Sequence, residues 1–78
     1  MALVNFYAAA RQAAGSSSQK IPAGNLSALI DHLVAINSEL AKLIPTCSFL
    51  INGTAAESND QILVEGDVVD VLPQFAGG

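Results

Sequence analysis

The sequence of 78 residues contains few basic side chains and a single cysteine. The sequence has three basic residues, Arg11, Lys20 and Lys42, and seven acidic residues, so the net charge is −4. Nucleic-acid binding needs a patch of lysine and arginine that neutralises phosphates, and we therefore expect no nucleic-acid partner. The single cysteine, Cys47, excludes an internal disulfide and any zinc or iron–sulfur cage built from cysteines.

Long apolar segments are also missing. No run approaches the ~20 residues that a membrane-spanning helix needs, and the first residues lack the basic start of a secretory signal. We therefore expect a soluble, cytoplasmic protein with no membrane partner. A hydrophobic fraction of 51% against a charged fraction of 13% still predicts a packed core. At this length, the core belongs to one small domain.

The side chains that could act in catalysis are isolated from one another. His32 is the only histidine, and since no nucleophile lies at a useful spacing from it, we interpret it as a solvated helix residue. Cys47 opens an apolar segment, which favours a small buried hydrophobe over a reactive thiol. A turn and a soluble edge explain the acidic residues Glu65, Asp67 and Asp70 better than acid–base chemistry does. The sequence predicts no catalysis by this chain alone.

The hydrophobic pattern predicts an α+β fold, in which a mixed sheet packs on one main helix. Strands are expected over 2–7, 19–21, 47–51 and 68–72, with a short helix between the first two that ends at Gly15. Asn25 is the expected N-cap of the main helix. The helix carries one apolar stripe at three- and four-residue spacing, which consists of Leu26, Leu29, Ile30, Leu33, Ile36 and Leu40.

Three smaller features complete the expected fold. Asn37 is expected to end the main helix and Ser38 to begin a new one. Ile62 and Leu63 are expected to tuck a short edge segment beneath the sheet, and residues 65–67 to form a tight turn.

The alternation in the first and last strands assigns their side chains to two faces. If these strands pair at the centre of the sheet, four residues meet the helix: Val4, Phe6, Val69 and Val71. The opposite face then presents Leu3, Tyr7, Val68 and Leu72. An exposed apolar patch of this kind is typical of a binding surface.

The end of the sequence, "LPQFAGG", raises a separate expectation. Pro73 cannot extend a central ladder, so we expect the sheet to release the chain near Leu72. Residues 1–73 would then form the domain and residues 74–78 a flexible arm. Glycine lacks a Cβ atom, so an arm ending in Gly77 and Gly78 can pass through a narrow channel and leaves its carboxyl carbon uncrowded.

Two segments carry a family resemblance. "FYAAARQAAG" near the start and "INGTAAESNDQILVEGDVVDVLPQFAGG" at the end are similar to the small subunit of molybdopterin synthase. The chain thereby resembles the MoaD-type members of the MoaD/ThiS family of ubiquitin-like sulfur carriers. The resemblance spans nearly the whole chain, and "GDVVDVLPQFAGG" is its specific part. It implies a β-grasp fold, in agreement with the element order.

The resemblance also implies a function. An adenylating activating enzyme would use ATP to activate the carboxylate of Gly78, and sulfur from a persulfide donor protein would displace AMP to leave a covalent thiocarboxylate. The chain would bind no cofactor or metal itself. It would act as the sulfur-donating small subunit of molybdopterin synthase, in a heterotetramer with the large subunit.

The resemblance gives roles to individual residues. Gly77 and Gly78 would let the arm enter a narrow channel, and the carboxylate of Gly78 would be the reacting group. The expected partner-binding residues anchor the arm or form the apolar docking face, and they are Phe75, Ala76, Leu72, Val68 and Tyr7. Arg11 matches a family position without a secure role, and it would brace the first loop against an acid.

Two alternatives remain open. In one, the same thiocarboxylate serves another pathway, such as thiamine thiazole or cysteine synthesis. In the other, the chain is a ubiquitin-like modifier that is joined to lysines through Gly78 without sulfur. The "FYAAAR" opening favours the molybdopterin pathway over the thiamine pathway.

Overall fold

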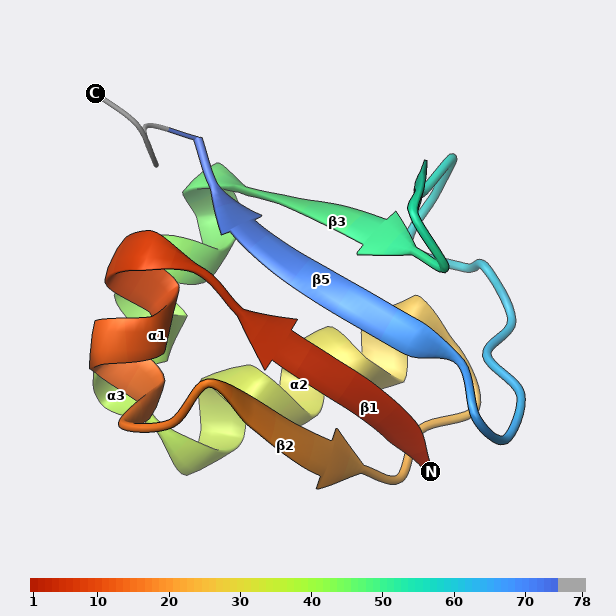
Figure 1. The fold of residues 1–78 in the computed structure, drawn as a ribbon, viewed down its shortest axis with the longest axis horizontal. Coiled ribbons are helices and arrows are strands. Elements are labelled where there is room, and N and C mark those ends of the chain that lie inside the picture. Colours follow the sequence, from red (N-terminus) through yellow and green to blue (C-terminus); the bar gives the residue numbers. More distant parts are fainter. Residues whose placement is uncertain (75–78) are drawn as a thin grey trace.

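A computed structural model describes residues 1–74 of the protein (Figure 1). Five strands form one mixed sheet in the spatial order β2-β1-β5-β3-β4. Their bounds are β1 Ala2–Phe6, β2 Ser18–Ile21, β3 Cys47–Ile51, β4 Thr54–Ala55 and β5 Val68–Pro73. The helices are α1 Ala8–Ala14, α2 Leu26–Ile36 and α3 Ser38–Leu43, followed by a 3₁₀ turn, η1 Ile44–Thr46. The predicted α+β layout is confirmed.

The first and last strands pair in parallel at the centre of the sheet. The register sets Val4 opposite Val69 and Phe6 opposite Val71, whereas the β1–β2, β3–β5 and β3–β4 pairs are antiparallel. In Figure 1, α2 crosses behind the sheet, while α1 and α3 lie together at the end towards which β1 and β5 both run. One face of the sheet is therefore covered by helix, and the other is not.

The core lies between the sheet and α2. The predicted inward residues Val4, Phe6, Val69 and Val71 are all buried. Of the predicted helical stripe, Leu26, Leu29, Leu33 and Leu40 are buried and Ile30 packs partly against them. Ile36 departs from the prediction, because it is 53% exposed. It is the last residue of α2, and the two residues before it, Val34 and Ala35, are exposed as well.

Two asparagines define the helix boundaries. The side-chain oxygen of Asn25 accepts a hydrogen bond from the amide of Ala28 at 2.8 Å, as an N-cap does. Asn37 ends α2 and also caps α3, accepting from the amides of Glu39 and Leu40 at 2.9 and 3.1 Å. The sequence correctly predicted the break, but the new N-cap is Asn37 rather than Ser38.

The segment between β3 and β5 is mostly irregular. Asn52 and Gly53 both have positive φ, +52° and +85°, which suits the two-residue turn that joins β3 to β4. Leu63 is buried as predicted, but its neighbour Ile62 is 68% exposed and forms only an isolated bridge with Asn25. The short strand β4 was not predicted.

Strand β5 continues one residue further than predicted. Pro73 remains in the strand opposite Cys47 and is buried. It has no amide hydrogen to contribute, but the next residue, Gln74, donates its amide to the carbonyl of Thr46 at 3.0 Å. Among residues 1–74, no helix is long and apolar enough to cross a membrane.

Candidate partner-binding face and the end of strand β5

The chain leaves the sheet between the start of α1 and the start of β3. Tyr7, which precedes α1, donates its amide to the carbonyl of Val71 at 3.2 Å, and Gln74 bonds to Thr46 on the other side of β5. Both neighbours of β5 therefore fix its carboxyl end. The predicted arm residues Phe75, Ala76, Gly77 and Gly78 lie outside the described residues, and their roles stay predictions.

Of the three described residues of the predicted docking face, the structure brings Tyr7 and Leu72 together and places Val68 apart from them. Tyr7 is 43% exposed and, through its bond to Val71, lies beside the carboxyl end of β5, next to half-buried Leu72. Val68 is half-buried at the opposite end of the strand, where it pairs with Leu3. All belong to the outer face of the sheet, which we define as the side away from α2. Its main residues are Leu3, Asn5, Ser48, Leu50, Val68, Asp70 and Leu72.

A polar pair that no local sequence pattern predicts, Asn5 and Asp70, divides this outer face. Asn5 and Asp70 are directly opposite in the β1–β5 register, and the side-chain amide of Asn5 donates to Asp70 Oδ1 at 3.1 Å. On the other side of Asp70, the β3 partner is Leu50. Both residues occupy outward positions of their strands, and it is the strand register that brings them together. Half-buried apolar residues therefore surround a central carboxylate.

A second polar cluster joins the β3–β4 turn to the start of β5. The side-chain amide of Asn52 donates to Asp67 Oδ1 at 3.0 Å, while its oxygen accepts from the amide of Val68 at 2.9 Å. Asp67 Oδ2 accepts from the amide of Val64 at 2.9 Å. The bonds from Val64 and from Asn52 hold the pKa of Asp67 below its usual value. We call this group the Asn52–Asp67 clasp.

The structure places Cys47, His32 and Arg11 apart from one another, on β3, α2 and α1. Cys47 lies on the inner side of β3, packs partly against the core and donates its thiol to the carbonyl of Leu43 at 3.3 Å. Burial raises the pKa of this thiol, which opposes nucleophilic behaviour. His32 is half-buried on α2. Arg11 is exposed on α1 and forms no ion pair with an acid of residues 1–74, so the predicted brace is not seen there.

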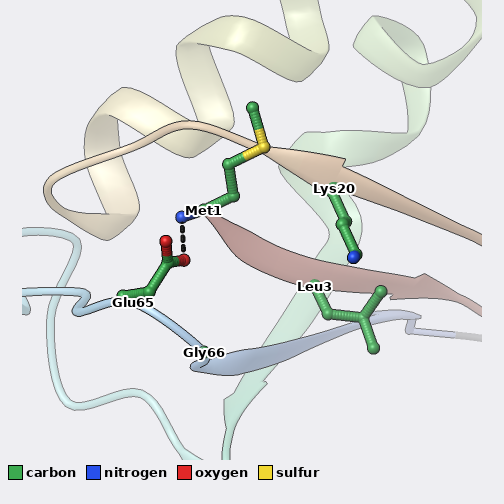
Figure 2. Close-up of a pocket in the computed structure, with 5 residues that line it drawn as sticks. All are labelled: Met1, Leu3, Lys20, Glu65 and Gly66. Atoms are coloured by element: carbon green, nitrogen blue, oxygen red, sulfur yellow. Dashed lines mark hydrogen bonds and ion pairs between the residues drawn. The ribbon is translucent and has the colours of Figure 1, made fainter.

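A hollow of about 360 Å³ lies at the amino end of β1 (Figure 2). Because β1 and β5 are parallel, Pro73 lies at the other end of the strands. It is lined by Met1, Leu3, Lys20, Glu65 and Gly66. The amino group of Met1 pairs with the carboxylate of Glu65, and this hydrogen bond holds the pKa of Glu65 below its usual value. None of the predicted site residues lines this hollow, so it is separate from the end of β5.

Residues 4–78 match the ThiS family. The chain belongs to this family. It is a ubiquitin-like protein of the MoaD/ThiS sulfur-carrier type, as the sequence predicted. No curated protein matches the sequence.

Solved structures share the β-grasp fold at low identity. The small archaeal modifier protein SAMP1 from Methanosarcina acetivorans superposes with a TM-score of 0.88 at 21% identity, over 99% of this chain and 95% of that chain. A chain in the complex of subunits 1 and 2 of the molybdopterin-converting factor from Helicobacter pylori gives 0.79 at 23%, over 99% and 97%. A chain in the BexX/CysO complex of Amycolatopsis orientalis gives 0.81 at 18%, over 100% of both chains.

These likenesses confirm the predicted ubiquitin-like β-grasp fold. They also show that proteins of this fold occur as modifiers and within complexes with a second protein. The pathway of the chain described here does not follow from the fold, because the three similar proteins belong to different systems.

Proposed function

We propose that this chain carries sulfur as a thiocarboxylate on Gly78 and donates it in molybdopterin synthesis as the small subunit of molybdopterin synthase. The observation that carries the proposal is the family match, which extends through residue 78 and so includes Gly77 and Gly78. The fold supports it, since β5 ends at Pro73 and the glycine pair follows a few residues later. Under this proposal, the domain carries the reactive carboxylate of Gly78 after its last strand.

The proposed chemistry needs no catalytic group on this chain. The Gly78 carboxylate attacks the α-phosphate of ATP on an activating enzyme, which gives an acyl adenylate and pyrophosphate. The terminal sulfur of a persulfide attacks the acyl carbon and expels AMP, so that an acyl disulfide forms. A second thiol reduces that disulfide, which leaves the thiocarboxylate and a protein disulfide. Glycine at the reacting position keeps the acyl carbon open to both attacks.

The molybdopterin pathway is favoured by the "FYAAAR" opening and by the similarity to a chain of the Helicobacter pylori complex. Under the proposal, the outer face docks on the large subunit and the residues after Pro73 reach its active site. Tyr7 and Leu72 lie beside the carboxyl end of β5, where they would contact that subunit first. The similarities to CysO and SAMP1 define the alternatives that the experiments must separate.

Reconstitution tests the proposed chemistry. The protein is incubated with an activating enzyme, ATP, a persulfide donor and a thiol, and its intact mass is measured. We expect one oxygen to be exchanged for sulfur at the carboxyl terminus. If the mass does not change while a known carrier reacts under the same conditions, the sulfur-carrier proposal is wrong.

A second step identifies the recipient. The thiocarboxylated protein is mixed with the large subunit of molybdopterin synthase and cyclic pyranopterin monophosphate, and dithiolene formation is followed. Product formation supports the molybdopterin pathway. Thiocarboxylate that yields no dithiolene points instead to another sulfur acceptor, and higher-mass conjugates to lysine in cells point to a modifier.

Deletion of Gly78 provides the matching variant. We expect sulfur loading to be abolished while the circular dichroism spectrum and the urea midpoint stay unchanged, because the described core is formed by residues 2–71. Glu57→Gln, in the exposed loop before β5, is the control that should load normally. Loading of the deletion variant at the normal rate would contradict the role of Gly78.

A further inference from the structure

The carboxylate of Asp70 lies in the middle of an apolar surface. Along β5, the nearest residues on the outer face are Val68 and Leu72, and across the strands they are Asn5 and Leu50. Three of these four neighbours are aliphatic and half-buried. Only Asn5 offers a hydrogen bond, and it occupies one oxygen, Asp70 Oδ1. The second oxygen, Oδ2, has no side-chain donor among residues 1–74.

Among residues 1–74, no cation forms an ion pair with Asp70. The only basic side chains are Arg11, Lys20 and Lys42. Lys42 pairs with Glu39, Arg11 is on α1, and Lys20 sits on the edge strand opposite Leu3, one row away from the Asn5–Asp70 pair. When no partner is bound, the carboxylate of Asp70 is therefore stabilised by hydration.

A partner that covers the outer face removes that water. A carboxylate that becomes buried without a compensating charge is strongly unfavourable, whereas a well-aligned ion pair with further hydrogen bonds offsets the loss of hydration. Because Asn5 already fixes Oδ1, the carboxylate is oriented before a partner arrives. The planar guanidinium of arginine can donate two parallel hydrogen bonds to such a group.

We infer that Asp70 is the receptor for a basic side chain, preferably arginine, that the partner presents from the centre of an apolar patch. The inference rests on the proposed function, which supplies the large subunit of molybdopterin synthase as that partner. The apolar ring of the outer face provides contact area, and the central ion pair fixes the register of docking. A partner with an uncharged or acidic group at this point is rejected, so Asp70 contributes specificity.

The test is the affinity of the purified large subunit from the same genome for wild type and for Asp70→Asn, measured by calorimetry. The substituted side chain has nearly the same shape and can still accept from Asn5. Loss of a buried charge partner predicts a Kd about 30-fold higher or more. Asp31→Asn makes the same change of charge at an exposed position of α2, the helix behind the sheet, and its Kd should change by about twofold or less.

Two further measurements exclude weaker explanations. A desolvated pair keeps its effect at about 0.5 M salt, where exposed charges are screened, so the difference between wild type and Asp70→Asn should persist there. Asp70→Glu retains the charge and should bind better than Asp70→Asn. Circular dichroism and urea unfolding of each variant show that the fold is intact.

The outcomes separate the inference from the function on which it rests. A large loss with Asp70→Asn that survives salt supports the inference. Unchanged or tighter binding, or a loss that disappears at high salt, overturns it while the sulfur-carrier function stands. If wild type fails to bind the large subunit and forms no dithiolene with it, the proposed function and this inference both fail.

Discussion

Single residues of this protein illustrate how hydrogen bonds tune ionisable groups. Asp67 accepts from two amide groups within the Asn52–Asp67 clasp, and both bonds favour its charged form. Its pKa is therefore lower in the folded than in the unfolded protein. A lowered pKa contributes stability at pH values above the unfolded pKa, and this contribution is lost as the pH falls through the folded pKa.

We therefore expect the free energy of unfolding to decline between about pH 5 and pH 2, with Asp67 responsible for part of the decline. In Asp67→Asn, urea denaturation at both ends of this range should show a smaller decline than in wild type. Glu65→Gln serves as the comparison, because the pKa of Glu65 is lowered chiefly by Met1 instead. An equal pH dependence in Asp67→Asn and wild type would show that the clasp has no role in acid stability.

Cys47 gives a prediction about reactivity. Burial raises its pKa, so less thiolate is present at neutral pH than for an ordinary cysteine. We expect a thiol reagent to label the native protein slowly at pH 7 and faster as the pH rises, and to label the urea-unfolded protein rapidly. Native labelling at the rate of a small model thiol would contradict the structural role assigned to Cys47.

At the scale of elements, Asn37 determines where one helix ends and the next begins. Its side-chain oxygen accepts from two amides of α3, and its side-chain amide donates to the carbonyl of Ala13 in α1 at 2.8 Å. It thus links all three helices. The sequence alone shows a capping residue here, but it does not show the bond to α1.

Asn37→Ala should lower the free energy of unfolding by about 1–2 kcal/mol, since a helix cap and a tertiary hydrogen bond are lost together. Asn25→Ala, which removes a cap with one bond, should cost less, about 0.5–1 kcal/mol. Urea denaturation measures both. If the two variants lose the same stability, the link from Asn37 to α1 is energetically unimportant.

The elements also show what the sequence could predict. The sequence pattern identified the main helix, four of the five strands and the inward side chains of the central strands, because burial of one face imposes a repeat of two or of three to four residues. Ile36 and Ile62 were misassigned because apolar character alone does not reveal where a helix ends or a loop turns outward. The Asn5–Asp70 pair needed the parallel register of strands 62 or more residues apart in sequence, beyond any local pattern.

At the scale of the whole molecule, the two faces of the sheet have different roles. The inner face stabilises the fold against α2, and the outer face has no covering element among residues 1–74. Substitutions on the two faces should therefore affect different measurements.

Leu29→Ala, in α2 and fully buried, should reduce the free energy of unfolding by about 2–5 kcal/mol. Tyr7→Ala, at an exposed position, should change stability little but should weaken binding of the proposed partner, the large subunit of molybdopterin synthase, by about 1–3 kcal/mol, as expected of a binding hot spot. Urea denaturation and calorimetry on both variants separate the effects. A Tyr7→Ala variant that is unchanged in affinity would remove this residue from the docking face.

The central position of β5 has a mechanical consequence. A force applied to Pro73 along the strand loads the parallel ladder to β1 and the antiparallel ladder to β3 together. The hydrogen bonds of both ladders lie across the direction of pull, so many must shear at once rather than open one after another. We therefore expect the domain to resist traction at the end of β5 better than it would if its last strand lay at an edge of the sheet.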